Sequence, residues 1–452
     1  LRRYIGHYPE RLHISWNELM ALGRTTPNSW DEKFNMSILA AHLAQEVNGV
    51  SMLHGTVTQE MFAKLWPGYL PEELHISYVT NGVHFATWTA KEWKKLFAEH
   101  LGKDFEQNLI GFDRWSKIEE MPDELIWQVK QTLRKKFIRT IRERFKENWI
   151  RRHEDPRQIV AINNTLSEQS LTICFARRFA TYKRAHLLFR NPERLAKIMN
   201  IPGKPVQFIF AGKAHPNDKA GQDLIKLIFE FSKRPEFLGK IIFLQNYDMN
   251  LAKMLLQGVD VWLNTPTRPL EASGTSGEKA VMNGVLHFSV LDGWWGEGYV
   301  KQAGWALPEE ITYDNPVYQD QLDAETIYSL LENEIAPLYY FRDEEGIPSG
   351  WVNYIKNCIA KVAPNFTMNR QLRDYDSKYY SRMYDRVKLL QRDEYYLVKE
   401  VSSWKKRVKS AWESVDVVSV SYPELSKEAA IGSKYTAKVV LDLNELSSDD
   451  IT

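Results

Sequence analysis

Five short apolar runs recur between residues 171 and 290, and a stretch with helical spacing follows each of them. The runs are residues 171–176, 206–210, 241–244, 259–263 and 285–290. Strands that are apolar throughout, with helices between them, are typical of a parallel sheet covered on both faces. Ligands of such sheets gather beyond the carboxyl ends of the strands. We therefore predict an α/β fold and expect functional residues in the connections after these runs.

One of these connections, residues 271–279, reads Glu-Ala-Ser-Gly-Thr-Ser-Gly-Glu-Lys and opens a predicted helix. The first-turn N–H groups of a helix lack intrahelical partners and the helix dipole favours negative charge, so this turn is a candidate anion site. Lys279 follows Thr275 by one helical turn. A phosphate at one end and an amine-reactive aldehyde at the other describe pyridoxal phosphate. A capped helix with a surface lysine is the alternative interpretation.

A second connection is strongly basic. Arg177, Arg178, Lys183 and Arg184 follow the first apolar run within eight residues. Four cations so close together repel one another unless an anion or acidic neighbours compensate them. Lysine and arginine clamps on phosphate oxygens are common at the carboxyl end of a strand. Together with residues 271–279, this cluster suggests a site for two phosphates, although a solvated basic loop is the simpler alternative.

Several ordered motifs carry a family resemblance. They are Val-Asn-Gly-Val with a histidine (residues 47–54), Thr-Asn-Gly-Val (80–83), Arg-Arg-x-x-x-Tyr-Lys-Arg (177–184), Ala-Gly-Lys-Ala (211–214), Phe-Leu-x-Asn-Tyr (243–247), Glu-Ala-Ser-Gly-Thr-x-x-x-Lys (271–279) and Met-Asn-Gly (282–284). In this order the chain resembles the glycogen/α-glucan phosphorylase family, of bacterial type, from about residue 30 to about residue 380. The resemblance implies reversible phosphorolysis of an α-1,4-glucan (glycogen, starch or maltodextrin) to glucose 1-phosphate, with retention of configuration.

The resemblance also implies roles for individual residues, with pyridoxal 5′-phosphate as the cofactor. Lys279 would anchor the cofactor as a Schiff base. Its phosphate, which exchanges a proton with the substrate phosphate in this family, would lie against Thr275, Ser276, Gly277 and Arg177, and its ring against Tyr247. Arg178 and Lys183 would hold the substrate phosphate, and with Glu271 they form the predicted catalytic set. The substrate-binding residues implied are Asn81, Ser273, Gly274 and Glu271, all toward glucose.

Two positions depart from the family pattern. Arg177 stands where lysine is more frequent, which keeps the charge but changes its geometry. Asp248 stands where muscle-type phosphorylases have arginine, so the surroundings of the cofactor ring nitrogen are open, and a carboxylate there would favour a protonated pyridine.

Composition narrows the classes of partner. The 59 basic and 58 acidic side chains leave a net charge near zero, which disfavours nucleic acid. Cys174 and Cys358 lie in apolar segments and suggest buried thiols in a reducing, cytoplasmic compartment. No apolar stretch approaches membrane-spanning length. We expect glucan and phosphate or glucose 1-phosphate as partners, no metal, no nucleic acid and no membrane, and leave a homodimer as an open option.

The resemblance implies a GT-B fold, in which two Rossmann-like domains face a cleft. We predict the end of the first domain over residues 1–80, the second, cofactor-binding domain over 81–330, helices that pack back on the first domain over 331–403, and the start of a small β domain over 404–452. Spacing predicts helices over residues 16–22, 38–47, 130–149 and 351–362, and a period of two predicts a hairpin with a turn at Ile431-Gly432. Both ends look cut, so we expect a fragment of a longer protein that is inactive alone.

Other polar or aromatic residues suit both structural and functional interpretations. His54, His84 and His215 have no ligand spacing and favour structural roles, whereas Asp292, Trp294 and Trp295 suit either the glucan path or packing.

Two other functions also remain as alternatives. One is a nucleotide-sugar-dependent glycosyltransferase of the same architecture, which has no need of Lys279. The other is a non-catalytic carbohydrate-binding or regulatory homologue.

Overall fold

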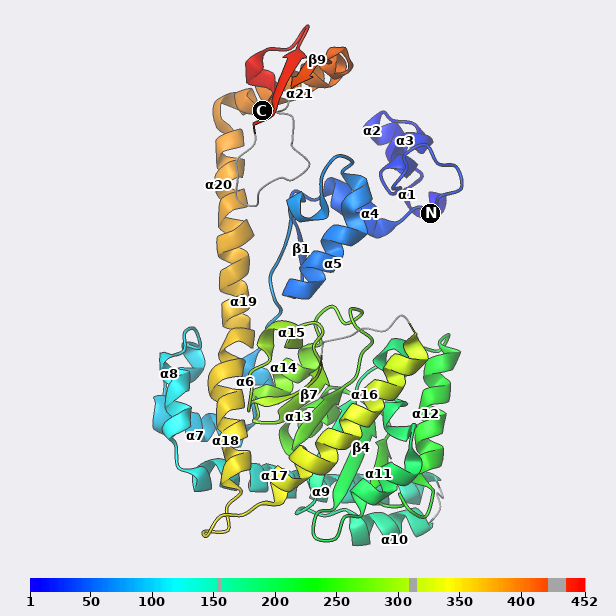
Figure 1. Cartoon of the computed structure of the whole chain (residues 1–452), viewed down its shortest axis with the longest axis vertical. Helices are drawn as coiled ribbons and strands as arrows, with labels where there is room; N and C mark the ends of the chain where they lie inside the picture. The colour runs from blue at the N-terminus through cyan, green and yellow to red at the C-terminus, as the bar shows by residue number, and fades with distance from the viewer. Residues whose placement is uncertain (153–155, 309–314, 422–435, 452) are drawn as a thin grey trace. The chain divides into compact units, whose positions relative to one another are not determined.

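A computed structural model describes residues 1–152, 156–308, 315–421 and 436–451 of the chain (Figure 1). The described residues fall into two compact units, Leu1–Tyr375 and Asp376–Thr452. Each unit is described by itself below. No helix in the described ranges combines the length and the apolar character that crossing a membrane requires.

The larger unit is built around a six-stranded sheet in the order β5-β4-β3-β6-β7-β8, and every neighbouring pair is parallel. The strands are β3 (Leu171–Ala176), β4 (Val206–Ala211), β5 (Ile241–Leu244), β6 (Val261–Asn264), β7 (Leu286–Val290) and β8 (Gly304–Leu307). This is the strand order of a doubly wound Rossmann-type sheet. From β3 the chain first adds strands on one side of the sheet, up to β5, and then returns to add β6, β7 and β8 on the other side. The α/β prediction and all five predicted strands are confirmed, whereas β8 was not predicted.

Helices cover both faces of the sheet, as the uninterrupted burial of its strands requires (Figure 1). Ile173 and Phe175 pack with α11 (Pro192–Met199), α12 (Lys219–Ser232) and α16 (Pro316–Leu330) in one core cluster. Cys174 and Ala176 point to the other face and into a second cluster. That cluster contains residues of α9 (Asp123–Arg152), α10 (Pro156–Thr165), α13 (Met249–Gly258) and α14 (Thr275–Val281). The predicted helix over 130–149 is thus part of α9.

The first 80 residues are not only helices and loops. The helices are α1 (Arg2–Ile5), α2 (Tyr8–Leu12), α3 (Trp16–Ala21), α4 (Met36–Leu43) and α5 (Met52–Phe62). The predicted helix over 38–47 ends early, because Val47–Gly49 forms a strand, β1, that pairs in parallel with β2 (Ile76–Tyr78). With α5 between them, β1 and β2 form one βαβ unit. Three-residue strands are too short to show a period of two, which explains why both were missed.

The remainder of the larger unit is helical. It contains α6 (Phe85–Trp88), α7 (Lys91–Leu101), α8 (Asp113–Ser116), α15 (Trp295–Gly298), α17 (Ala336–Tyr340), α18 (Ser349–Asn357) and α19 (Met368–Tyr375). The predicted helix over 351–362 is α18 continued by a π-helical turn, Cys358–Val362. Gly284, at a φ of 58°, lies against Ile355 and Ile359, so a side chain there has no room.

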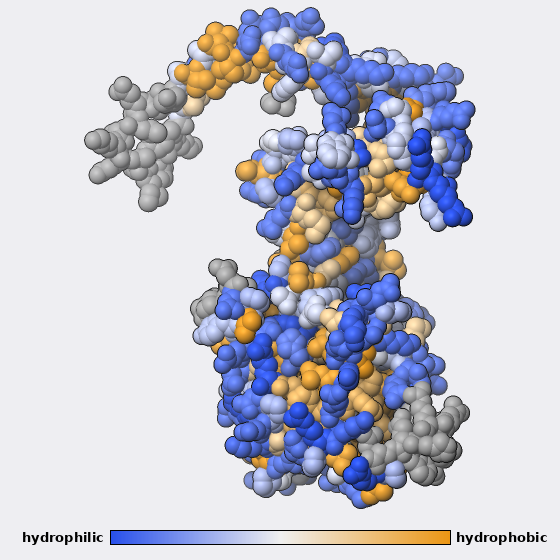
Figure 2. All heavy atoms as spheres, turned by 90° about the vertical axis from the view of Figure 1, so that its right-hand side faces the viewer, coloured by the Kyte–Doolittle hydropathy of each residue, from blue (hydrophilic) through white to orange (hydrophobic). Residues whose placement is uncertain are grey.

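The smaller unit contains α20 (Ser381–Leu390), α21 (Tyr396–Ala411) and an antiparallel pair, β9 (Asp416–Ser421) and β10 (Lys438–Asp442). Both strands of the predicted hairpin are confirmed, and the predicted turn at Ile431-Gly432 lies outside the described residues. Asp450 joins the end of the unit to α21, because it accepts hydrogen bonds from Trp404 and Arg407. The valines of both strands are exposed and contribute to the apolar surface near the top of Figure 2.

Candidate active site

The predicted site residues gather where the strand order reverses. Arg177 follows the last residue of β3, and Asn264 is the last residue of β6, the neighbouring strand. Asp292 comes two residues after β7, which pairs with β6 on its other side. The carboxyl ends of these three strands therefore bring together polar groups that are far apart in sequence. This edge is the usual ligand site of an open parallel sheet.

Glu271 is the centre of a buried ionic cluster. Its Oε2 accepts a hydrogen bond of 2.5 Å from Nη2 of Arg177 and another from Nζ of Lys183. Nη1 of Arg177 donates to Oδ1 of Asn264, which fixes the orientation of the guanidinium. Burial by itself raises the pKa of the Glu271 carboxyl, but the charges of Arg177 and Lys183 outweigh it, so this pKa lies below its ordinary value. The cluster brings one carboxylate and two cationic side chains together in a largely buried position.

One donor in this cluster has no partner. Nε of Arg177 is buried and, among the described residues, it donates to no oxygen. An unpaired buried N–H is costly, so such a group is usually satisfied by a ligand or water. Burial has the largest effect on the pKa of the Arg177 guanidinium. It lowers this pKa, although the neighbouring Glu271 carboxylate acts to raise it. An anion beside Arg177 would accept a hydrogen bond from Nε and would favour the charged guanidinium, which opposes the effect of burial on its pKa.

The loop that carries Glu271 is held by Asp292. The Glu271 N–H donates to Oδ2 of Asp292 at 2.9 Å, and the Gly293 N–H donates to Oδ1 at 2.8 Å. Gly293 has a φ of 55°, and a Cβ there would meet the Ser273 carbonyl oxygen at 2.3 Å, so only glycine fits. Burial raises the pKa of Asp292 to about 6. Asp292 therefore positions the loop, while Trp294 and Trp295 are fully buried packing residues.

The start of α14 is the turn that the sequence analysis assigned to a phosphate. Gly274 precedes it at a φ of 88°, which turns the chain sharply into the helix. The Gly277 N–H donates to the Gly274 carbonyl at 3.0 Å, whereas the sequence analysis assigned it to the cofactor phosphate. The backbone N–H groups of Thr275 and Ser276 are closer to the helix end, and the Ser276 hydroxyl also accepts from Nε1 of Trp262 at 3.1 Å. Thr275 and Ser276 are thus the better cradle residues.

Lys279 lies in a partly apolar environment that suits an imine-forming amine. Its Nζ is 4.1 Å from the centroid of the Trp88 ring. Burial lowers its pKa, which increases the fraction of neutral, nucleophilic amine. Tyr247 is partly buried, and burial raises the pKa of its hydroxyl, so it stays neutral. Together with the cradle and the unpaired donor of Arg177, these features fit a ligand with a phosphate and an aldehyde, as pyridoxal phosphate has.

The basic cluster after β3 divides into two parts. Arg178 is exposed, and Lys183 is buried against Glu271. Arg184 is buried elsewhere: it forms ion pairs with Asp320 at 3.0 Å and Asp323 at 2.6 Å, and it donates to the Thr265 and Pro266 carbonyl oxygens. Two acidic neighbours therefore neutralise Arg184, whereas Lys183 shares the single carboxylate of Glu271 with Arg177.

The predicted sugar contacts have protein partners in this structure. Oδ1 of Asn81 accepts from Nε2 of Gln371 at 2.9 Å. The Ser273 hydroxyl lies 3.5 Å from Oε1 of Glu278, a fully buried carboxyl whose pKa burial raises well above its ordinary value. A neutral Glu278 can accept from Ser273 without carrying a charge into the core. These hydrogen bonds hold both side chains in defined orientations.

Several other residues have local structural roles. Nδ1 of His54, His84 and His215 contacts the Val50 N–H, the Thr87 hydroxyl and the Asn217 N–H, respectively. Asp248 caps α13 by accepting the Leu251 N–H at 2.8 Å. This hydrogen bond gives Asp248 a structural role, as the N-cap of α13, that does not involve a cofactor ring. No group of three metal-ligating side chains exists within the residues that the structure describes.

Sequence reasoning missed Asn264, the second partner of Arg177, and Trp88, the neighbour of Lys279. Asn264 is polar and directly follows three apolar residues, Val261 to Leu263, which is a signal for a strand-end ligand residue. Trp88 is 191 positions away from Lys279 in the sequence, and nothing local marks it.

A doubly wound parallel sheet with a charged site at its switch point defines the class of α/β proteins whose ligands bind beyond the carboxyl ends of the strands. Within that class, comparison with known families is specific. The family described as Carbohydrate phosphorylase matches residues 12–301. The chain belongs to the carbohydrate phosphorylase family, as its motifs predicted.

Known relatives agree with this assignment. The chain is 45% identical over 371 residues to a glycogen phosphorylase of Aquifex aeolicus, which covers 82% of the chain and 52% of the relative. It is 39% identical over 436 residues to a maltodextrin phosphorylase of Thermococcus litoralis, covering 96% and 50%. A glycogen phosphorylase of Mycobacterium tuberculosis is 36% identical over 420 residues, covering 93% and 48%. The chain spans about half the length of these curated relatives.

Proposed function

We propose that the complete protein is an α-glucan phosphorylase, a glycosyltransferase that acts on glycogen, starch or maltodextrin. In the forward direction an oxygen of inorganic phosphate bonds to C1 of the terminal glucose, the C1–O4 bond breaks, and O4 of the shortened glucan takes a proton. The product is glucose 1-phosphate with retained configuration. The observation that carries this proposal is the cluster of Arg177, Lys183 and Glu271 beside the helix that bears Lys279.

The roles of the residues follow from charge and position. Lys183 and the exposed Arg178 neutralise the substrate phosphate, and water exclusion around the buried Lys183 strengthens its contribution. Glu271, Ser273, Gly274 and Asn81 orient the glucose ring through its hydroxyl groups. Glu271 also keeps Arg177 and Lys183 in place when no substrate is present, because it forms ion pairs with both.

The cofactor of this proposal is pyridoxal 5′-phosphate. Lys279 would hold its aldehyde carbon, and Tyr247 would lie toward its ring. Thr275, Ser276 and Arg177 would hold its phosphate, whereas the Gly277 N–H already donates to the Gly274 carbonyl. When bound, this group supplies a phosphate that exchanges a proton with the substrate phosphate. The positive charge of Arg177 would stabilise the negative charge of the cofactor phosphate, since two phosphates side by side require cationic neighbours.

The wider assignments belong to the same proposal. The complete enzyme has a GT-B arrangement. Residues 1–80 form the end of its first domain, and residues 81–330 form the cofactor-binding domain. Residues 331–403 form helices that pack on the first domain, and residues 404–452 begin a β domain. It acts in the cytoplasm on glucan and phosphate and needs neither nucleic acid nor a membrane. A homodimer is compatible with it.

A direct assay separates this function from its alternatives. The complete protein, loaded with pyridoxal phosphate, is incubated with maltodextrin and phosphate, and glucose 1-phosphate is measured. Formation of glucose 1-phosphate supports the proposal. Glucan extension from a nucleotide sugar without pyridoxal phosphate identifies the glycosyltransferase instead, and glucan binding without either reaction identifies a non-catalytic homologue.

A further inference from the structure

The turn that carries Asn81 is held on both sides of its backbone. The Asn81 N–H donates to the Val50 carbonyl at 3.0 Å, and the Asn81 carbonyl accepts from Nη2 of Arg370, on α19, at 2.9 Å. A Cβ on Gly82 would meet the Thr367 carbonyl oxygen at 2.3 Å, so only glycine allows this close approach of the turn to the start of α19. The backbone at Asn81 is therefore fixed, and only the orientation of its side-chain amide is left to be set.

A second contact ties this region to the loop of residues 271–274. Val50 is followed by Ser51, which is fully buried and donates from its hydroxyl to the Ala272 carbonyl at 2.8 Å. Two successive hydrogen bonds therefore connect Asn81 to this loop, one through Val50 and one through Ser51. They bring Asn81 near the candidate active site.

Gln371 connects α19 to the turn through both ends of its side-chain amide. Its Oε1 accepts from the Gly82 N–H at 3.1 Å, and its Nε2 donates to Oδ1 of Asn81 at 2.9 Å. A backbone N–H can only donate, so the end of the Gln371 amide that faces Gly82 must be the oxygen. The nitrogen of Gln371 then faces Asn81, which must present its own oxygen. One backbone group therefore sets the direction of both hydrogen bonds.

Nδ2 of Asn81 is the free end of this series of hydrogen bonds. It donates to no oxygen of the residues that the structure describes, and Asn81 is half-buried, so the group is accessible to a ligand. An amide nitrogen donates hydrogen bonds and does not accept them. A ligand group at this position must therefore offer a lone pair.

We propose that Gln371 is a positioning residue that decides how Asn81 recognises the sugar: Nδ2 of Asn81 donates to a glucose hydroxyl, which is recognised as an acceptor. This inference rests on the function proposed above, in which Asn81 contacts glucose. Fluorine in place of that hydroxyl keeps a weak acceptor, whereas hydrogen in its place accepts nothing. The fluoro-to-deoxy ratio of kcat/KM at that carbon therefore reports the direction of the hydrogen bond.

Analogues of glucose 1-phosphate test this direction in the complete protein loaded with pyridoxal phosphate. Each ring hydroxyl in turn is replaced by hydrogen or by fluorine, and kcat/KM for glucan extension is measured at about pH 7.5, where a carboxylate is ionised. The hydroxyl that Asn81 contacts is the one whose removal costs less in Asn81→Ala. The fluoro-to-deoxy ratio in Asn81→Ala also gives the inductive effect of fluorine alone. We expect the unchanged protein to exceed this baseline by roughly threefold or more.

Gln371→Glu should reverse this preference. The introduced carboxylate only accepts, so it takes hydrogen bonds from both the Gly82 N–H and Nδ2 of Asn81, and Oδ1 of Asn81 then faces the sugar. Fluorine facing this oxygen is repelled, so the fluoro-to-deoxy ratio should fall below the Asn81→Ala baseline. A role of Gln371 in stability alone would lower kcat/KM for both analogues and leave their ratio unchanged.

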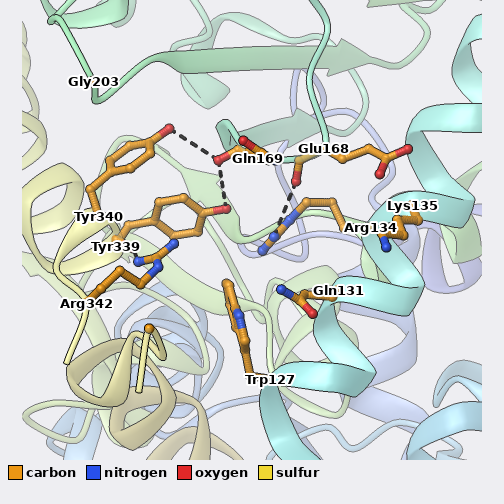
Figure 3. Close-up of a pocket in the computed structure, with 11 residues that line it drawn as sticks. Trp127, Gln131, Arg134, Lys135, Glu168, Gln169, Gly203, Tyr339, Tyr340 and Arg342 are labelled. Carbon is orange, nitrogen blue, oxygen red and sulfur yellow. Dashed lines mark hydrogen bonds between the residues drawn. The ribbon is translucent and has the colours of Figure 1, made fainter. Parts of the chain in front are cut away.

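Two variants control for the added charge. Asn369→Asp introduces a carboxylate on the same helix, at a residue that makes none of these hydrogen bonds. Gln131→Glu makes the same chemical change on α9, where Gln131 lines a pocket of about 530 Å³ (Figure 3). Glu168 and Gln169 line this pocket and precede β3, so it lies at the amino-terminal ends of the strands. Both variants should keep the ratio of the unchanged protein.

The possible failures are distinguishable. A complete protein that does not use glucose 1-phosphate contradicts the proposed function, and this inference with it. An active protein contradicts the inference alone if Asn81→Ala changes the cost of no deoxy analogue, if the unchanged protein matches the Asn81→Ala baseline, or if Gln371→Glu keeps the original ratio. If Gln371→Glu does not fold, Gln371→Met decides: the Asn81 amide is then free to turn, and the ratio should fall toward the baseline. An unchanged ratio in that variant would refute the inference.

Discussion

The backbone N–H of Glu271 donates to the carboxylate of Asp292 across 2.9 Å, so two acidic residues of one site are joined through a main-chain hydrogen bond. Their environments differ: Arg177 and Lys183 keep Glu271 ionised, whereas burial raises the pKa of Asp292 to about 6. Pairs of carboxyl groups whose pKa values diverge are characteristic of sites with divided roles. Here Glu271 faces the cations, and Asp292 sets the position of its loop.

The raised pKa of Asp292 predicts a specific pH dependence of stability. Its folded-state pKa of about 6 exceeds the ordinary 3.8, so the folded state binds the proton more tightly than the unfolded state. This group therefore makes the free energy of unfolding fall as pH rises from about 4 to 6, by at most about 3 kcal/mol. Asp292→Asn should remove that component in urea titrations across this range. An unchanged pH slope relative to Asp223→Asn, an exposed control, would contradict the assignment.

Arg178→Ala and Lys183→Ala should mainly impair the use of phosphate or glucose 1-phosphate by the complete enzyme. For the buried Lys183, losing one charge-assisted contact costs about 2–4 kcal/mol of transition-state stabilisation, or roughly 10²–10³ in rate, and the exposed Arg178 should lose less. Steady-state kinetics with phosphate and glucan varied in turn measure this. Lys219→Ala, in an exposed pair with Asp223, is the control. A loss of glucan affinity with normal phosphate dependence would place both residues in another site.

Asp260→Asn should be strongly destabilising. Asp260 is fully buried, pairs with Arg134 and accepts the Thr172 N–H at 3.0 Å, and so ties α9 to the starts of β3 and β6. Removing its charge leaves Arg134 buried and unpaired, which typically costs about 3–5 kcal/mol. Chemical denaturation measures the loss. Glu143→Gln removes an exposed pair with Arg139 and should cost about 1 kcal/mol or less, so equal losses in the two variants would refute this account.

The 452-residue chain by itself should not catalyse phosphorolysis at the rate of a complete relative. Ligand sites of two-domain proteins lie between the domains, and this chain spans about half the length of its relatives. Without a second wall, water screens the phosphate charges and the sugar loses contacts. Glucose 1-phosphate formation from maltodextrin measures this directly. A rate comparable to that of a complete family member would overturn the expectation.

Much of the parallel sheet could be predicted because its strands are buried on both faces and are mostly apolar. Leu171–Ala176 and Ile241–Leu244 have the predicted bounds. Gly304–Leu307 was missed because it begins with glycine, which leaves only three apolar residues in the strand. Val47, the first residue of β1, was assigned to a helix because local spacing cannot reveal the partner strand of β1.

Candidate site residues could be predicted where they lie within one sequence motif, as in residues 271–279. The contacts that position these residues could not be predicted, because they join residues that are far apart in the sequence. Asp292 and Glu271 are 21 residues apart, and only the fold of the loop brings the carboxylate to the N–H. Arg184 belonged to the same basic motif as Lys183, yet the acids of α16 neutralise it, and sequence spacing gives no sign of that pairing.

Identification of the lysine that binds pyridoxal phosphate tests the central claim most directly. The protein is reconstituted with pyridoxal phosphate and reduced with borohydride, and its peptides are mapped by mass. Lys253 is the matched control residue, because its Nζ is 5.9 Å from the Trp88 ring that Lys279 approaches to 4.1 Å. Our account predicts a label on Lys279, loss of the imine absorbance in Lys279→Ala, and normal labelling in Lys253→Ala. A label on another lysine, or an unchanged spectrum in Lys279→Ala, would contradict it.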